Sequence, residues 1–128
     1  MSIYAVDFDH TLSVGEYKYP DVGRPNIALM AFLKKKREEG NKVILWTCRE
    51  DKDLEVALGW LRNLGMEFDA VNDNADVMKE AWGSNPRKVF ADYYIDDRSV
   101  SDYTELLPKS SAEPKEIKTQ KTRIIRWR

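Results

Sequence analysis

The stretch from Val6 to Leu12 constrains the fold of this chain more than any other. It follows the apolar run Ile3–Val6, whose β-favouring residues predict a buried strand. A strand that is apolar on both faces is typical of the centre of a parallel sheet. Because residues i and i+2 share one side of a strand, Asp7 and Asp9 can serve one pocket. That pocket would lie at the carboxyl end of the sheet, where open α/β sheets bind ligands.

Two neighbouring carboxylates repel each other unless a proton or a cation lies between them. Mg²⁺ fits this need, because it prefers oxygen ligands and commonly uses only one or two carboxylates. An isolated Asp-Phe-Asp is more simply explained as a strand end followed by a turn that caps the next element. The rest of the chain decides between these two interpretations.

Helical and strand patterns alternate after this motif. Gly and Pro residues make Ser13–Asn26 an irregular loop. The helix expected after it has an apolar side made of Ile27, Met30, Ala31 and Leu33. In total we expect helices over residues 26–39, 54–64 and 76–82, and strands over 43–46, 68–71 and 89–95, the last with a break at Asp92. This alternation predicts an α/β fold, a doubly wound (Rossmann-like) parallel sheet of four to five strands with helices on both faces.

Length and composition favour a single cytoplasmic domain. A chain of 128 residues can bury a substantial core, and its net charge of −1 does not indicate a nucleic-acid or membrane binder. The single cysteine, Cys48, permits no internal disulfide, which suits a reducing compartment. No apolar run approaches the length of a membrane span, and the chain starts directly with a strand rather than a signal peptide.

Charge divides the chain into an acidic body and a basic tail. Residues 1–108 contain 14 Lys and Arg against 20 Asp and Glu, a net charge of −6, whereas residues 109–128 contain 7 against 2, a net charge of +5. We therefore expect one folded domain over 1–108 and a basic tail over 109–128. Within the tail, the β-favouring residues 122–127 predict an edge strand or a subunit contact.

Residues able to do chemistry form four sites beside the predicted strands, and the order of these sites resembles the haloacid dehalogenase superfamily of phosphohydrolases. The first motif of that superfamily, Asp-x-Asp-x-Thr after a strand, matches Asp7, Asp9 and Thr11. Its second motif, a Thr or Ser closing the next strand, matches Thr47, and its third, a Lys or Arg before the acidic motif, matches Lys88. Its fourth motif, an acidic pair, matches Asp96 and Asp97. The resemblance covers residues 3 to about 107 and leaves the tail unexplained.

This resemblance implies a Mg²⁺-dependent phosphomonoesterase that works through an aspartyl-phosphate. Phosphoryl transfer needs a nucleophile, a counter-cation, donors to the phosphoryl oxygens and an acid for the leaving oxygen. Asp7 would be the nucleophile, and Asp9 would be the acid and then the base, which requires a raised pKa. Thr47 would bind a phosphoryl oxygen, and Lys88, with Arg87 as its competitor, would offset negative charge. The implied metal ligands are Asp7, Asp9, Asp96 and Asp97, with Asp96 as the third metal carboxylate and Asp97 either a ligand through water or a hydrogen-bonding partner of a ligand.

Simpler roles exist for each residue outside the first motif. Thr47 alone would cap a helix, Lys88 alone would be a solvated charge, and Asp96-Asp97 would start a turn. Arg49 either contacts substrate or pairs with an acid, and Cys48 is expected to be a small buried residue. Two other classes of protein compete with an enzyme. A receiver domain fits poorly, because the third strand does not end in the required Asp, and a catalytically silent relative would bind a phosphorylated ligand or partner.

No residues remain for a cap domain. The intervals between the four motifs are consumed by the predicted loops, helices and strands, so only Ser13–Asn26, with Tyr17 and Tyr19, can lean over the crevice. An open crevice admits a phosphorylated small molecule or the phosphorylated end of a macromolecule. The tail or the Ser13–Asn26 loop would supply contacts for a homo-oligomer.

Overall fold

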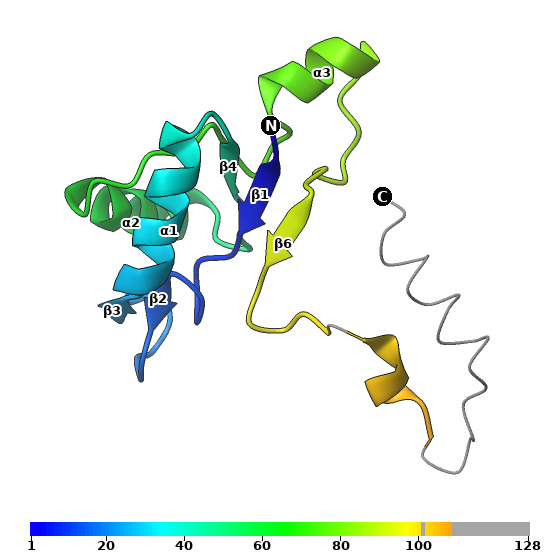
Figure 1. Cartoon of the computed structure of the whole chain (residues 1–128). Coiled ribbons are helices and arrows are strands. Elements are labelled where there is room, and N and C mark those ends of the chain that lie inside the picture. The colour runs from blue at the N-terminus through cyan, green and yellow to red at the C-terminus, as the bar shows by residue number, and fades with distance from the viewer. Residues whose placement is uncertain (101, 109–128) are drawn as a thin grey trace. The chain divides into compact units, whose positions relative to one another are not determined.

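A parallel sheet of four strands is the centre of the N-terminal part of the chain (Figure 1). The structure, a computed structural model, describes residues 1–100 and 102–108, and it divides the chain into two units, 1–97 and 98–128. In the first unit, β1 (Ile3–Val6) lies between β4 (Lys42–Leu45) and β6 (Tyr93–Ile95), and β5 (Ala70–Val71) pairs with β4. The predicted α/β class is therefore confirmed, with four parallel strands in the described residues.

The register of the sheet brings three strand ends to one edge. Val6 of β1 lies opposite Leu45 of β4 on one side and Ile95 of β6 on the other. The ladder continues one step further, since the Asp7 N–H donates to the Ile95 carbonyl (2.9 Å) and the Trp46 N–H donates to the Val6 carbonyl (2.8 Å). Residues that follow β1, β4 and β6 therefore emerge side by side at the carboxyl edge.

Two helices cover one face of this sheet. Met30 and Leu33 of α1 (Ile27–Glu38), together with Ala57 and Leu61 of α2 (Asp51–Asn63), bury their side chains against β1 and β4. Asn26, the first residue of the predicted helix 26–39, is the N-cap of α1, because its side chain accepts a hydrogen bond from Leu29 N–H (3.2 Å). Ile27 and Ala31, which were predicted to face the core, are exposed, since α1 meets the sheet along the stripe through Met30 and Leu33.

The second face has a different cover. Ile3, Ala5 and Ile44 pack there against Ala75 and against the segment 89–91. The short helix α3 (Asp76–Trp82) contributes partly buried Met78 but no fully buried residue. Helices on both faces are thus confirmed only in part, since an irregular segment supplies much of this second layer.

The strand predicted over 89–95 is shorter than expected, because its first half hydrogen-bonds to side chains. Phe90 N–H donates to Asn74 Oδ1 (2.7 Å), and Tyr94 Oη donates to the Val89 carbonyl (2.6 Å). Ala91 N–H donates to Tyr94 Oη (3.2 Å). The apolar residues 89–91 are buried or partly buried. Their backbone joins the sheet only at Asp92, whose N–H donates to the Ile3 carbonyl (2.8 Å).

The predicted irregular loop Ser13–Asn26 contains a short antiparallel pair. Its strands are β2 (Ser13–Val14) and β3 (Arg24–Pro25). Gly23 fits beside them because a Cβ there would overlap the Val14 carbonyl and the Tyr17 ring. Between Leu12 and Lys88 the described chain holds only this pair, the helices and strands of the sheet and their connections, so it contains no cap domain, as predicted.

Of the second unit, the structure describes one short 3-10 helix, η1 (Tyr103–Leu106), which begins after Asp102. The first unit ends at Asp97, whereas the sequence placed a domain end at Pro108. The predicted tail, with its edge strand over 122–127, lies outside the described residues and stays a prediction. None of the described helices has the length and apolar character that a bilayer span requires.

Candidate active site

Three carboxylates meet at the carboxyl edge of the sheet. Asp7 follows β1, and Asp96 and Asp97 follow the neighbouring strand β6. One carboxylate oxygen from each lies within 4.8 Å of the others. We call these three residues the carboxylate cluster. Asp7 is partly buried, whereas Asp96 and Asp97 are exposed.

The environment of Asp7 favours its protonated form. Burial is the largest cause, and the neighbouring charges of Asp96 and Asp97 add to it, so that the pKa of Asp7 rises from 3.8 to about 6. Thr11, which the tight turn after Phe8 brings back toward β1, places its hydroxyl 3.5 Å from Asp7 Oδ2. That turn requires a left-handed residue, and His10 supplies it with φ 63°.

The donor set of the carboxylate cluster fits a hard divalent cation. Its ligand atoms are carboxylate oxygens, which Mg²⁺ prefers, and one or two of them commonly suffice. A cation between the three groups would offset both the burial and the neighbouring negative charges that raise the pKa of Asp7. Three of the four predicted metal ligands are therefore brought together, and Asp9 is not among them.

Asp9 instead forms an ion pair with Arg49. The Arg49 Nε–H donates to Asp9 Oδ2 (2.9 Å) and Nη2–H donates to Asp9 Oδ1 (2.8 Å), while the Tyr17 hydroxyl donates to the same Oδ1 (2.8 Å). The Arg49 side chain is 0% exposed and that of Asp9 is 23% exposed. Sequence left open whether Arg49 pairs with an acid, and here it does.

The expectation of a raised pKa at Asp9 is wrong for this arrangement. Burial alone raises the pKa of Asp9, but the hydrogen bonds from Arg49 and Tyr17, together with the positive charge of Arg49, outweigh it and lower the pKa. The same pairing raises the pKa of the Arg49 guanidinium. Asp9 is therefore an ionised carboxylate near neutral pH, which suits a base better than an acid.

Thr47 follows β4 at the same edge of the sheet. Its N–H donates to Asn72 Oδ1 (2.8 Å), and its hydroxyl oxygen accepts a hydrogen bond from Arg49 N–H (3.1 Å). Because the hydroxyl accepts here, its own proton can be donated to another oxygen. Cys48, the next residue, is exposed, contrary to the prediction, because the chain has already left the sheet.

Lys88 is not brought to the carboxylate cluster. Its side chain is exposed and forms no ion pair among the residues that the structure describes. Its carbonyl lies 3.5 Å from Asn74 Nδ2, in the segment that leads to the amino end of β6, whereas Asp7 lies at the carboxyl end of β1. Arg87 is likewise exposed. The basic role in this site therefore stays a prediction.

Sequence reasoning missed how Arg49 and Asn72 support the site. Asn72 comes directly after β5, and Arg49 lies in the loop between β4 and α2, so the sequence marks both as candidates for contacts at this edge but does not identify their partners. Asn72 emerges beside Thr47 because β5 pairs with β4, which the sequence does not show.

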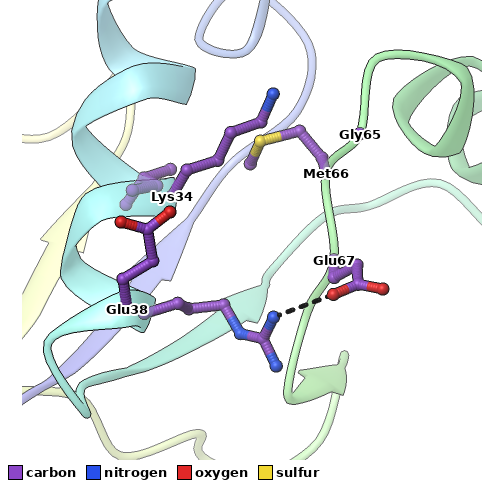
Figure 2. Close-up of a pocket in the computed structure, with 7 residues that line it drawn as sticks. Lys34, Glu38, Gly65, Met66 and Glu67 are labelled. Atoms are coloured by element: carbon purple, nitrogen blue, oxygen red, sulfur yellow. Dashed lines mark hydrogen bonds and ion pairs between the residues drawn. The ribbon is translucent and has the colours of Figure 1, made fainter.

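Several hollows of the surface lie away from the carboxylate cluster. One, of about 340 Å³, lies between the carboxyl end of α1 and the loop after α2 (Figure 2). Lys34 and Glu38 approach it from α1, and Met66 and Glu67 from the loop. Arg37 crosses this region and is bound to Glu67 (3.3 Å) and to both oxygens of Asp69 (3.1 Å each). These contacts join α1 to the start of β5 and leave no unpaired charge for a ligand at Arg37.

A solved structure of a conserved protein from Bacteroides thetaiotaomicron is similar to this chain over nearly its whole length. The two sequences are 32% identical, the match covers 99% of this chain and 98% of the other, and the TM-score is 0.64. No protein-family model matches the chain, and no curated protein matches it either. Because almost a third of the residues are identical across nearly the full length of both chains, this chain belongs to the same family as the conserved Bacteroides thetaiotaomicron protein.

Proposed function

We propose that this protein is a metal-dependent phosphomonoesterase of the haloacid dehalogenase type, with Asp7 as the nucleophile. The observation that carries the proposal is the convergence of Asp7, Asp96 and Asp97 within 4.8 Å at the carboxyl edge of a parallel sheet. Such an edge is where open α/β sheets bind ligands. The raised pKa of Asp7, about 6, supports the same role, since perturbed carboxylates gather at functional sites.

The carboxylate cluster would hold Mg²⁺. When bound, the cation would keep Asp7 ionised and reduce its repulsion from an incoming phosphate. Thr11 and Thr47 hydroxyls lie at the same edge of the sheet, and Thr47 has a proton to donate to a phosphoryl oxygen.

The reaction would proceed in two displacements at phosphorus. In the first, an Asp7 oxygen forms a bond to phosphorus and the bond to the leaving oxygen breaks, which gives an aspartyl-phosphate. In the second, water attacks phosphorus, Asp9 accepts the proton of that water, and Asp7 leaves as a carboxylate with release of inorganic phosphate. Arg49 keeps Asp9 ionised. Asp9 is therefore better suited to accept the proton of water in the second step than to protonate the leaving oxygen in the first. Esters with good leaving groups should therefore react fastest.

A catalytically silent phosphate binder is the second candidate. The observation that favours it is the bidentate Arg49–Asp9 pair, which occupies a residue that a phosphatase needs for proton transfer. Such a protein would bind Mg²⁺ and a phosphorylated ligand at the carboxylate cluster without turnover.

An assay with an aryl phosphate separates the two candidates. The full-length protein is measured in excess chelator and with Mg²⁺, and Mg²⁺ binding is measured by calorimetry in parallel. A phosphatase turns over only with Mg²⁺, and a brief quench should leave one phosphoryl group on Asp7, detectable by mass spectrometry. Mg²⁺ binding without turnover would identify the silent binder. Equal turnover in chelator would exclude the metal-dependent mechanism.

A further inference from the structure

Arg49 joins three separate parts of the chain through its guanidinium. Besides the two hydrogen bonds to Asp9, Nη1 donates to the carbonyls of Pro20 (2.8 Å) and Asp53 (3.1 Å), and Nη2 donates to the carbonyl of Asp21 (2.8 Å). All five guanidinium hydrogens are therefore used. The guanidinium carbon also lies 4.8 Å from the centre of the Phe8 ring and 4.9 Å from that of the Tyr19 ring.

Residues 17–21 are tied down beside Asp9 by these contacts, and we call them the cover segment. Arg49 holds its carboxyl end at Pro20 and Asp21. At its amino end, the Tyr17 hydroxyl donates to Asp9 Oδ1 (2.8 Å). Between them, the Tyr19 hydroxyl donates to Asp53 Oδ2 (2.7 Å) in the first turn of α2. The position of the cover segment and the orientation of Asp9 thus depend on the same side chain.

The hydrogen bonds of Arg49 and Tyr17 leave the Asp9 carboxylate one acceptor position for a reacting group. A carboxylate offers about four acceptor positions, two on each oxygen. Arg49 and Tyr17 occupy both positions of Oδ1, and Arg49 occupies one of Oδ2. The remaining acceptor position belongs to Oδ2.

Burial of the Arg49 guanidinium costs hydration free energy, so packing alone does not explain an arginine at this position. Apolar side chains of similar volume often replace a buried ion pair with no loss of stability, because the ions lose their hydration. Arg49 is fully buried and Asp9 is partly exposed. The planar guanidinium, with its rigid set of donors, is therefore expected to have a role beyond packing.

We propose that Arg49 is a positioning residue of this site, which fixes the cover segment beside Asp9 and presents Asp9 to reacting groups through Oδ2. The part that concerns Asp9 in catalysis rests on the proposed phosphatase function. The part that concerns the cover segment does not, since it follows from contacts of Arg49 alone.

The kinetic test compares Arg49→Lys and Arg49→Ala with Arg24→Lys, a matched change at an exposed arginine of the Ser13–Asn26 loop, which contains the cover segment. Lysine keeps the charge but cannot bind both oxygens of Asp9 together with three carbonyls. With an aryl phosphate we expect kcat to fall about 100-fold in Arg49→Lys, as misplacement of a reacting group commonly costs, with little change in KM. The Mg²⁺ affinity should stay unchanged, since the donors of Arg49 go to Asp9 and to carbonyls and none to the carboxylate cluster. Guanidinium ion, but not ammonium ion at equal ionic strength, should restore part of kcat in Arg49→Ala.

Hydrogen exchange tests the cover segment independently of turnover. The Asp21 N–H donates to the Lys18 carbonyl (2.9 Å) and the Gly23 N–H to Ser13 Oγ (2.7 Å), so both amides should exchange slowly in the wild type. In Arg49→Lys they should exchange roughly tenfold faster, the factor expected for the loss of one hydrogen bond to a charged group, while β4 amides stay unchanged.

Unchanged exchange and unchanged kcat in Arg49→Lys would overturn the proposal. If the variants do not fold, the wild type still decides, because unprotected amides at Asp21 and Gly23 would also overturn it. A wild type that neither binds Mg²⁺ nor turns over substrate would refute the phosphatase function and, with it, the catalytic role given to Asp9. Faster exchange in Arg49→Lys would even then support the role of Arg49 in holding the cover segment.

Discussion

Asp7 and Asp9 lie two residues apart, yet their surroundings move their pKa values in opposite directions. Burial and two acidic neighbours raise the pKa of Asp7, whereas Arg49 and Tyr17 lower that of Asp9 against the effect of burial. Carboxylates whose environments separate their pKa values in this way commonly divide acid, base and nucleophile roles between them. Here the surroundings disfavour the ionised form of Asp7 and favour the ionised form of Asp9.

Asp7 should make the metal-free protein less stable as the pH rises. Its pKa is about 6 in the folded state against 3.8 ordinarily, so the folded state binds more protons between these values. Stability therefore falls through that window and stays low above it, by at most about 3 kcal/mol, since a tenfold change in proton affinity corresponds to about 1.4 kcal/mol. Melting temperatures in chelator should show this fall in the wild type and not in Asp7→Asn, with Glu55→Gln, at an exposed position of α2, as control. A similar fall in both would contradict it.

Removal of single members of the carboxylate cluster should weaken metal binding unequally. We expect Asp96→Ala to raise the Mg²⁺ concentration needed for half-maximal activity more than Asp97→Ala does, since we expect Asp97 to act through water or through a hydrogen bond to a ligand.

Asp7→Asn should abolish turnover and the covalent intermediate, a loss of about 10³-fold or more. Titrations of activity and calorimetry with Mg²⁺ measure both effects. Near-wild-type turnover in purified Asp7→Asn would remove the nucleophile assignment.

Asp9→Asn should cost stability as well as activity. The change leaves the buried Arg49 cation without its charge partner, and breaking such a pair commonly costs about 3–5 kcal/mol when both groups are buried. Because Asp9 is partly exposed, we expect about 2 kcal/mol. Urea unfolding measures this, with Asp21→Asn as control, since Asp21 binds Arg49 only through its backbone. If the aspartyl-phosphate also persists longer in Asp9→Asn than in the wild type, the base role is supported.

At the scale of elements, sequence predicted those segments whose own pattern is strong. The apolar run of β1 and the helical patterns over 26–39 and 54–64 are local signals, and β1, α1 and α2 form close to the predicted ranges. The segment 89–92 was misjudged because its apolar residues are buried while its backbone is satisfied by Asn74 and Tyr94. A run of apolar residues indicates burial, but it does not say which groups take the backbone hydrogen bonds.

Asn74 should be the most costly polar residue to remove from this layer. It is 1% exposed, accepts from Phe90 N–H (2.7 Å) and donates to the Pro86 carbonyl (3.0 Å) and to Asn85 Oδ1 (3.0 Å). Asn74→Ala leaves the partly buried Phe90 N–H unpaired, so we expect a loss of about 1–3 kcal/mol. Urea unfolding measures it, with exposed Asn63→Ala as control. A loss below that of the control would show that the segment 85–90 is held by its apolar contacts alone.

At the scale of the whole molecule, the sequence predicts which residues reach the carboxyl edge of the sheet, but it does not predict which of them contact each other there. Parallel strands deliver their following residues to one edge, so the meeting of Asp7 with Asp96 and Asp97 follows from the motifs. The separation of Asp9 from the cluster did not follow, because the competing arginine comes after a different strand and its partners come from the loop before α1. Lys88 was assigned only from its order along the chain, and it lies in the segment that leads to the amino end of β6, whereas the carboxylate cluster lies at the carboxyl edge of the sheet.

The absence of a cap domain from the described chain should govern which substrates react. Asp96 and Asp97 are exposed, and the part of the chain held beside Asp9 is the cover segment of residues 17–21. Water exclusion strengthens charge stabilisation, so an open site needs closure from that segment, from a partner subunit or from the substrate itself. A large substrate can supply this closure, whereas a small phosphate ester cannot. We therefore expect low and broad kcat/KM values for small sugar and alkyl phosphates, and higher values for phosphorylated macromolecular ends.

A substrate screen tests this expectation under one set of conditions, with saturating Mg²⁺ and Asp7→Asn as the control for contaminating phosphatases. The small esters are compared with a phosphorylated peptide and with a phosphorylated oligonucleotide, and the oligomeric state is measured at the assay concentration. A larger substrate should gain at least about tenfold in kcat/KM, the ratio that 1.4 kcal/mol of additional transition-state binding supplies. Strong selectivity for one small sugar phosphate by a monomer would contradict this prediction, because it would mean that the cover segment alone closes the site.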